Sequence, residues 1–163
     1  MLQVDWKRFS PPYRDTFLAH DYNEAYQKSE YLIFVDHDVD FTPFVLERMK
    51  FHIEQEPNKV HVGPYLLYPL STRLPSPVWH MRRFSWADKG MNSVWGELSW
   101  DTCDSFAFGF TYIPKHEWEQ LYLQIESMRW QRVADCYGFE RWHSGKYEPA
   151  KIEWDCVVCH THV

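Results

Sequence analysis

The element around which this chain is predicted to fold is an apolar strand that ends in an acidic turn, Tyr31-Leu32-Ile33-Phe34-Val35-Asp36-His37-Asp38-Val39-Asp40. A continuous apolar run indicates a strand whose two faces are both covered, as in a parallel sheet flanked by helices. In open α/β sheets, ligands bind outside the carboxyl ends of the strands. The stretch therefore predicts an α/β fold with a ligand site at the acidic turn.

Helices are predicted on both sides of this strand. Residues 13–29 have an amphipathic helical pattern, with apolar positions at Leu18, Tyr22, Ala25 and Tyr26. After the turn, Thr42 is a predicted N-cap and Pro43 the first helical residue, and the helix is expected to end near Glu56. Strand, turn and helix together form an α/β unit.

The remaining elements are predicted from shorter patterns. We expect strands over 59–68, with a bend at Gly63-Pro64, over 105–113 and over 151–162, and a helix around 118–128. The Trp-rich stretch 69–104 is expected to be a long loop with short strands. The predicted fold is a single domain over 1–163, a mixed, mainly parallel sheet flanked by helices.

Composition narrows the classes of protein. The 163 residues are 45% hydrophobic and 18% aromatic, enough for one packed core and for aromatic side chains on a surface that stacks on sugars or bases. No run of about 18 apolar residues and no signal-peptide pattern occur, so we expect a cytoplasmic chain without a membrane span. A net charge of -6 without a Lys/Arg-rich block argues against nucleic acid as a binding partner. Four unevenly spaced cysteines are expected to be reduced.

The acidic turn is a candidate metal site. Carboxylates at Asp36 and Asp38 repel each other unless a cation neutralises them, and their hard oxygens suit Mg²⁺ or Mn²⁺, which can also bridge a diphosphate. The alternative is a purely structural turn before the Thr42 cap, because Asp is common in turns and caps.

Residues 31–49 resemble the segment around the DxD motif of GT-A-type glycosyltransferases, the nucleotide-diphospho-sugar transferase fold. Residues 19–23 lie in register with that family's Ala-Arg-Asn-x-Gly pattern, although Arg, Asn and Gly are replaced. Residues 109–115 are similar to the strand before the family's acceptor-side helix, and 137–142 to a later acidic segment. The resemblance implies that Asp36 and Asp38 hold the divalent ion that binds the donor diphosphate.

The resemblance also implies further site residues. The family often completes its metal site with a His or Asp near the end of the domain, which suggests His160 first and His162 second; the alternative is an exposed polar strand end. In an inverting enzyme a carboxylate takes the proton of the acceptor hydroxyl, and Glu140 is the candidate base. The runners-up are Asp135, Asp101 and Asp104, and a retaining enzyme needs no such base.

Residues 156–160, Cys-Val-Val-Cys-His, also match the c-type haem attachment pattern and offer zinc-type ligands. Both the haem and the zinc interpretation are weaker than that of a plain strand in the core of the domain. Haem attachment needs an oxidising compartment, and ligands spread along one strand project to opposite faces, so a tetrahedral site is hard to close.

The GT-A fold normally begins with a βαβ unit that binds the nucleotide, and this chain has room for only one short strand, around 2–6, before the first helix. The predicted fold is therefore a partial GT-A domain, N-terminally truncated relative to the family. Missing strands leave a sheet edge open, so we expect a homo-oligomer or a partner chain that covers it.

The expected function is a metal-dependent glycosyltransferase, or a fragment of one, that transfers a sugar from a nucleotide-diphosphate donor to a carbohydrate or other hydroxyl acceptor. One alternative is a non-catalytic carbohydrate-binding or assembly module on the same fold. The other is a His/Asp metallohydrolase built on His160, His162 and Asp36.

Overall fold

The structure is a computed structural model of the chain, and it describes residues 2–3, 22–35, 39–65, 78–85, 90–95, 100–106, 109–127 and 148–160. Within these ranges, none of the helices has the length and apolar character that a membrane crossing requires.

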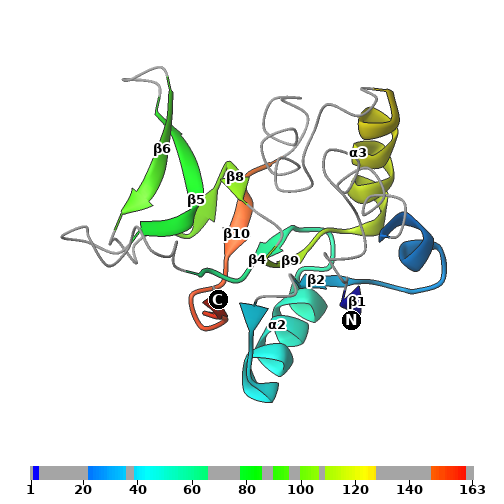
Figure 1. Cartoon of the computed structure of the whole chain (residues 1–163), viewed down its shortest axis with the longest axis horizontal. Helices are drawn as coiled ribbons and strands as arrows, with labels where there is room; N and C mark the ends of the chain where they lie inside the picture. The colour runs from blue at the N-terminus through cyan, green and yellow to red at the C-terminus, as the bar shows by residue number, and fades with distance from the viewer. Residues whose placement is uncertain are drawn as a thin grey trace.

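The centre of the fold is an open six-stranded sheet, in the order β1, β2, β9, β4, β10, β7 (Figure 1). The strands are β1 (Leu2–Gln3), β2 (Ile33–Val35), β9 (Phe110–Tyr112), β4 (His61–Val62), β10 (Ala150–Ile152) and β7 (Thr102–Cys103). The pairs β1–β2 and β4–β10 are parallel, and the other three are antiparallel.

The prediction of an α/β fold with a mixed sheet is confirmed, but the prediction that pairing is mainly parallel is wrong. Strand β9 lies between β2 and β4 and is antiparallel to both. Strands β2 and β4 therefore run in the same direction without touching each other. The predicted strand and helix are present as β2 and α2, whereas Asp36 to Asp38 between them lie outside the described residues, and β9 occupies the place between β2 and β4.

Helices cover both faces of the sheet. Helix α2 (Pro43–Gln55) packs on one face, and α3 (Lys115–Ser127) packs on the other together with the helical residues 22–27 (Figure 1). Side chains of neighbouring residues 32–35 alternate between the two sides: Leu32 and Phe34 join the α3 core, whereas Ile33 and Val35 join the α2 core. This double coverage explains why the strand is apolar at every position.

The α3 core is built around Trp118, which is fully buried. Its ring lies 6.1 Å from that of Tyr22 and 5.3 Å from that of Phe34, measured between centroids. The indole Nε1 donates a hydrogen bond of 3.2 Å to Asn23 Oδ1, so the polar edge of the ring is satisfied. Burial raises the pKa of Tyr26, whose hydroxyl donates to the carbonyl of Ile113.

Helix α2 begins as predicted. The Thr42 side chain accepts a hydrogen bond of 3.3 Å from the backbone N–H of Val45, and Pro43 occupies the first turn, where its missing N–H removes no helical bond. Met49 and Ile53 point into the core, and Glu56 is the C-cap.

Two smaller sheets complete the described fold. Strands β3 (Val39–Asp40) and β11 (Cys159–His160) form one. Strands β6 (Gly90–Trp95), β5 (Val78–Ser85) and β8 (Ser105–Phe106) form the other, and the long β5–β6 hairpin extends away from the main sheet (Figure 1). The stretch 69–104, predicted as a long loop with short strands, thus holds β5, β6 and β7 among its described residues.

Two predicted strands are divided in the structure. The strand predicted over 105–113 becomes β8 and β9, which belong to different sheets. At Gly109 a Cβ atom would lie 2.2 Å from the Tyr65 ring, so the backbone runs too close to that ring for a side chain. The strand predicted over 151–162 becomes β10 and β11, because a turn at 154–155 separates them.

Candidate functional site

In the sequence, Asp36 and Asp38 directly follow an inner strand of the sheet, β2. Strand β2 has neighbours on both sides, β1 and β9. Asp36 and Asp38 lie outside the described residues, but the residues that bound the turn are described and buried: Val35 before it and Val39 after it. The turn thus follows a strand that is fixed on both edges and both faces.

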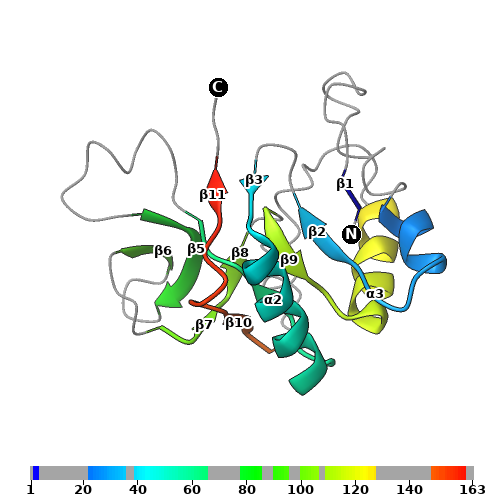
Figure 2. The ribbon, with the colours of Figure 1, turned by 90° about the horizontal axis from the view of Figure 1, so that it is seen from below.

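The C-terminal strand β11 pairs with the strand that follows the turn. Its register places the Cα of His160 opposite that of Val39, and Cys159 opposite Asp40 (Figure 2). The backbone of His160 therefore lies opposite the residue that directly follows Asp38 in the sequence. The side chain of His160 and the whole of His162 lie outside the described residues.

The alternation predicted for the C-terminal strand holds where it is described. Cys156 and Val158 are buried in the α2 core, whereas Val157 between them is 42% exposed. A backbone hydrogen bond links this segment to the residues that follow β4, because the N–H of Val158 donates to the carbonyl of Pro64 at 3.0 Å.

The candidate bases are not all within reach of the turn. Glu140 and Asp135 lie outside the described residues. Asp101 and Asp104 flank β7, the edge strand that stands four neighbours away from β2 in the sheet. At about 4.8 Å per strand that separation is about 19 Å, so these two carboxylates lie far from β2, the strand that precedes Asp36 in the sequence.

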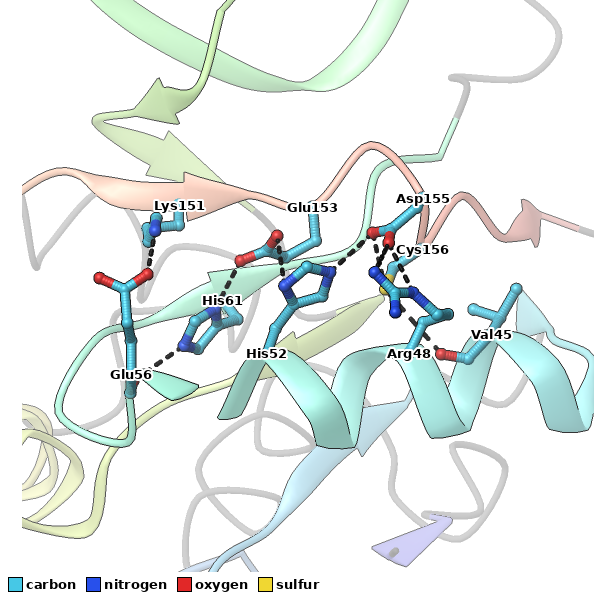
Figure 3. Close-up of polar contacts among 9 residues, drawn as sticks. All are labelled: Val45, Arg48, His52, Glu56, His61, Lys151, Glu153, Asp155 and Cys156. Atoms are coloured by element: carbon cyan, nitrogen blue, oxygen red, sulfur yellow. Dashed lines mark hydrogen bonds and ion pairs between the residues drawn. The ribbon is translucent and has the colours of Figure 1, made fainter. Parts of the chain in front are cut away.

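A second polar site lies between α2 and the segment after β10 (Figure 3). We call it the α2 polar cluster; its members come from α2, β4 and the turn that follows β10, and they are Arg48, His52, His61, Glu153, Asp155 and Cys156. Of these six residues the sequence patterns singled out only Cys156, as part of the Cys-Val-Val-Cys-His pattern and not for this site.

His52 stands between two carboxylates. Its Nδ1 lies 3.2 Å from Glu153 Oε2, and its Nε2 lies 2.8 Å from Asp155 Oδ1. Carboxylate oxygens only accept hydrogen bonds, so both contacts are hydrogen bonds at once only when the ring is protonated at both nitrogens.

Asp155 is shared between His52 and Arg48. The Arg48 guanidinium approaches Asp155 Oδ2 through Nε at 2.7 Å and Nη2 at 2.6 Å, which leaves Oδ1 facing His52. Partial burial acts to raise the pKa of Asp155, but the hydrogen bonds from His52 and Arg48 outweigh it and hold the pKa below its usual value.

The buried end of the cluster is the pair of His61 and Glu153. His61 is fully buried, and its Nδ1 lies 2.6 Å from Glu153 Oε1. The other ring nitrogen lies 2.9 Å from the backbone carbonyl oxygen of Glu56. Glu153 is therefore held by two imidazoles, one on each carboxylate oxygen.

Cys156 lies at the side of the cluster that borders the α2 core. The Sγ atom lies 3.6 Å from Asp155 Oδ1 and 3.9 Å from the carbonyl oxygen of Val45. Burial is the main reason that the pKa of the Cys156 thiol is raised, and the Asp155 charge adds to it. Ligand atoms of His52, Asp155 and Cys156 all lie within 4.8 Å of one another, a spacing that a metal ion could bridge.

The cluster depends on a close backbone contact. Glu153 donates its N–H to the carbonyl of Val62 at 3.0 Å, and Cys156 donates its N–H to that of Glu153 at 2.8 Å. A Cβ atom on Gly63 would lie 2.8 Å from the carbonyl oxygen of Cys156. A glycine at the predicted bend thus lets the turn after β10 pack against the β4 segment.

Sequence patterns missed this cluster because its partners are far apart in the chain: 103 residues separate His52 from Asp155 and 92 separate His61 from Glu153. One local signal was present. Arg48 and His52 are four residues apart on a helix and so share one face, which marks a polar stripe on α2.

Comparisons with known proteins add little. No protein-family model matches this chain, and no curated protein matches it. Among solved structures, it is similar to A197 from STIV, a viral protein, with 15% identity and a TM-score of 0.49. The match covers 91% of this chain and 62% of that chain, so this chain spans less than two thirds of that protein. An identity of 15% and a TM-score of 0.49 support no inference about activity.

Proposed function

We propose that this chain is the metal-binding part of a metal-dependent glycosyltransferase that uses a nucleotide-diphosphate sugar. The proposal rests on the resemblance of residues 31–49 to the GT-A segment. The single structural observation in its favour is the pairing of β11 with β3, in which His160 lies opposite Val39, the residue after Asp38 in the sequence.

In this proposal Asp36 and Asp38 bind Mn²⁺ or Mg²⁺, and the ion bridges the two phosphates of the donor. His160 completes the coordination, with His162 as the second choice. Glu140 takes the proton of the acceptor hydroxyl if the reaction inverts the sugar. A turn after a strand fixed on both faces supports this role, because a metal site needs ligands whose backbone does not shift.

The test is calorimetry of the full chain with uridine diphosphate and guanosine diphosphate, with Mn²⁺ and after its removal by EDTA. We expect binding that requires Mn²⁺ and that weakens at least about tenfold when Asp36→Ala and Asp38→Ala are combined, as expected when metal ligands are lost. The matched control is Asp40→Asn, an exposed acid two residues from the turn, which should bind as the wild type does.

Two results would count against the proposal. One is the absence of Mn²⁺-dependent binding of either nucleotide to the wild-type chain. The other is equal binding by the double variant and the wild type. Sugar binding that is unchanged by EDTA and by the double substitution would instead favour the non-catalytic carbohydrate-binding module.

A further inference from the structure

We propose that His52, Asp155 and Cys156 bind a zinc ion that joins α2 to the C-terminal segment. The site is separate from the acidic turn and shares no residue with it. It rests on three side chains from two elements that are far apart in sequence and adjacent in space (Figure 3).

The geometry of the ligand atoms suits a tetrahedral ion. Zinc binds His nitrogen and carboxylate oxygen at about 2.0–2.2 Å and Cys sulfur at about 2.3 Å, so ligand atoms of one site lie about 3–4 Å apart. Here His52 Nε2 is 2.8 Å from Asp155 Oδ1, and that oxygen is 3.6 Å from Cys156 Sγ. A small side-chain adjustment would admit the ion, and water would take the fourth position.

The surroundings of His52 match those of a metal-bound imidazole. A histidine that ligates zinc usually donates its other ring N–H to a carboxylate, which fixes the ring and raises its basicity. The Nδ1 of His52 lies 3.2 Å from Glu153 Oε2, with Nε2 directed at Asp155. Glu153 in turn lies 2.6 Å from Nδ1 of the buried His61, which fixes the carboxylate that His52 Nδ1 contacts.

Charge and proton balance are consistent with a divalent ion. On binding, Cys156 gives up its thiol proton and the Nε2 of His52 offers its lone pair in place of the hydrogen bond to Asp155. Arg48 occupies Asp155 Oδ2 and leaves Oδ1 for the ion. The charges of the ion, the thiolate, Asp155, Glu153 and Arg48 then cancel.

The donor set also distinguishes this ion from the one proposed at the turn. One nitrogen, one oxygen and one sulfur favour zinc, whereas the oxygen-rich turn favours Mn²⁺ or Mg²⁺. Cys156 lies three residues before β11. An ion at this site would therefore anchor the segment that brings β11 alongside β3.

The experiment uses the full chain after removal of metals with EDTA. Zinc binding is measured by calorimetry, and Co²⁺ is used as a spectroscopic substitute because thiolate coordination gives it a charge-transfer band. We expect one zinc ion per chain, a thiolate band with Co²⁺, and a higher Tm with zinc and not with Mg²⁺. His52→Ala and Cys156→Ser should each weaken zinc binding more than about 100-fold, since loss of an outer-shell partner alone costs about 10–100-fold.

Matched controls isolate the three ligands. Cys159→Ser and His116→Ala remove an exposed thiol and an exposed imidazole elsewhere and should leave zinc affinity unchanged. The combined Asp36→Ala and Asp38→Ala variant should also keep it, so that this proposal and the proposed function can fail separately. His52 is only partly buried, so its substitution tests the site even if Cys156→Ser impairs folding.

Three outcomes would overturn the proposal. They are no zinc binding to the wild-type chain, a Co²⁺ spectrum without a thiolate band, and zinc affinity that is lost with Cys159→Ser while it survives Cys156→Ser. The last result would move the site to the exposed end of the C-terminal segment.

Discussion

Substitution of Glu153 by alanine tests the energetic role of the α2 polar cluster. Glu153 is 7% exposed, and its carboxylate oxygens lie 2.6 Å from His61 Nδ1 and 3.2 Å from His52 Nδ1. His61 is 0% exposed, so water cannot replace the lost acceptor without opening the core. Glu153→Ala therefore leaves a buried ring nitrogen without its partner.

The size of the effect follows from these contacts. An unsatisfied buried donor costs about 1–3 kcal/mol, and a hydrogen bond to a charged group contributes about 1.5–3 kcal/mol. His52 is better exposed and can recover part of its loss from water. We therefore expect Glu153→Ala to lower the free energy of unfolding by about 3 kcal/mol.

The assay is urea unfolding in EDTA, which keeps metal binding out of the measurement. With an m-value of about 2 kcal/mol/M, a loss of 3 kcal/mol shifts the midpoint by about 1.5 M. The matched control is Glu24→Ala: Glu24 pairs with Lys28 across one helical turn with both side chains about two-thirds exposed, and its loss should leave the urea midpoint nearly unchanged.

A paired substitution sharpens the same test. His61→Leu combined with Glu153→Leu removes both partners of the buried contact, and it should cost clearly less than the two single changes added together, because neither of these two side chains is left buried without the other. If Glu153→Ala costs no more than Glu24→Ala, or if the two leucine substitutions are additive, the cluster does not stabilise the fold in the way argued.

Three further predictions concern the core, the close backbone contact and the response to alkali. Trp118→Ala should cost about 3–5 kcal/mol in urea unfolding, against less than about 0.5 kcal/mol for the exposed Leu123→Ala on the same helix; similar costs would contradict the assigned core. Gly63→Ala should cost about 1–3 kcal/mol, because its Cβ would lie 2.4 Å from the Phe110 ring and 2.8 Å from the Cys156 carbonyl oxygen; an unchanged urea midpoint would mean that the turn after β10 is not packed there. Burial raises the pKa of Tyr112 from 10.0 to about 12, so the free energy of unfolding falls as the pH rises from 10 towards 12. Over that interval the free energy of unfolding of Tyr112→Phe should fall by about 1–2 kcal/mol less than that of the wild type, and parallel curves for the two proteins would refute this.

Much of the secondary structure could be predicted because its signals are local. The apolar run 32–35 specified a strand covered on both faces, and each residue joins the core on the side that alternation assigns to it. The Thr42 cap, Pro43 and the end at Glu56 were correct because a helix terminus is satisfied by residues within one turn of it. The stripe around Trp118 identified α3 for the same reason.

Strand pairing could not be predicted in this way. The sequence pattern of residues 105–113 does not indicate that β9 lies between β2 and β4, or that β8 belongs to a different sheet. Both are settled by side-chain packing between distant segments, such as the contact of Gly109 with the Tyr65 ring. The parallel sheet expected from the apolar strand is mixed for this reason.

The sequence alone determined an α/β chain with a strand covered on both faces and followed in the sequence by Asp36 and Asp38, since hydrophobic periodicity and capping act between neighbouring residues. Only the tertiary structure decided that β11 returns to lie beside β3, and that His52, His61, Glu153, Asp155 and Cys156 meet on one side of α2. These contacts join residues about a hundred positions apart, and their geometry exists only after the sheet and both helical layers have packed.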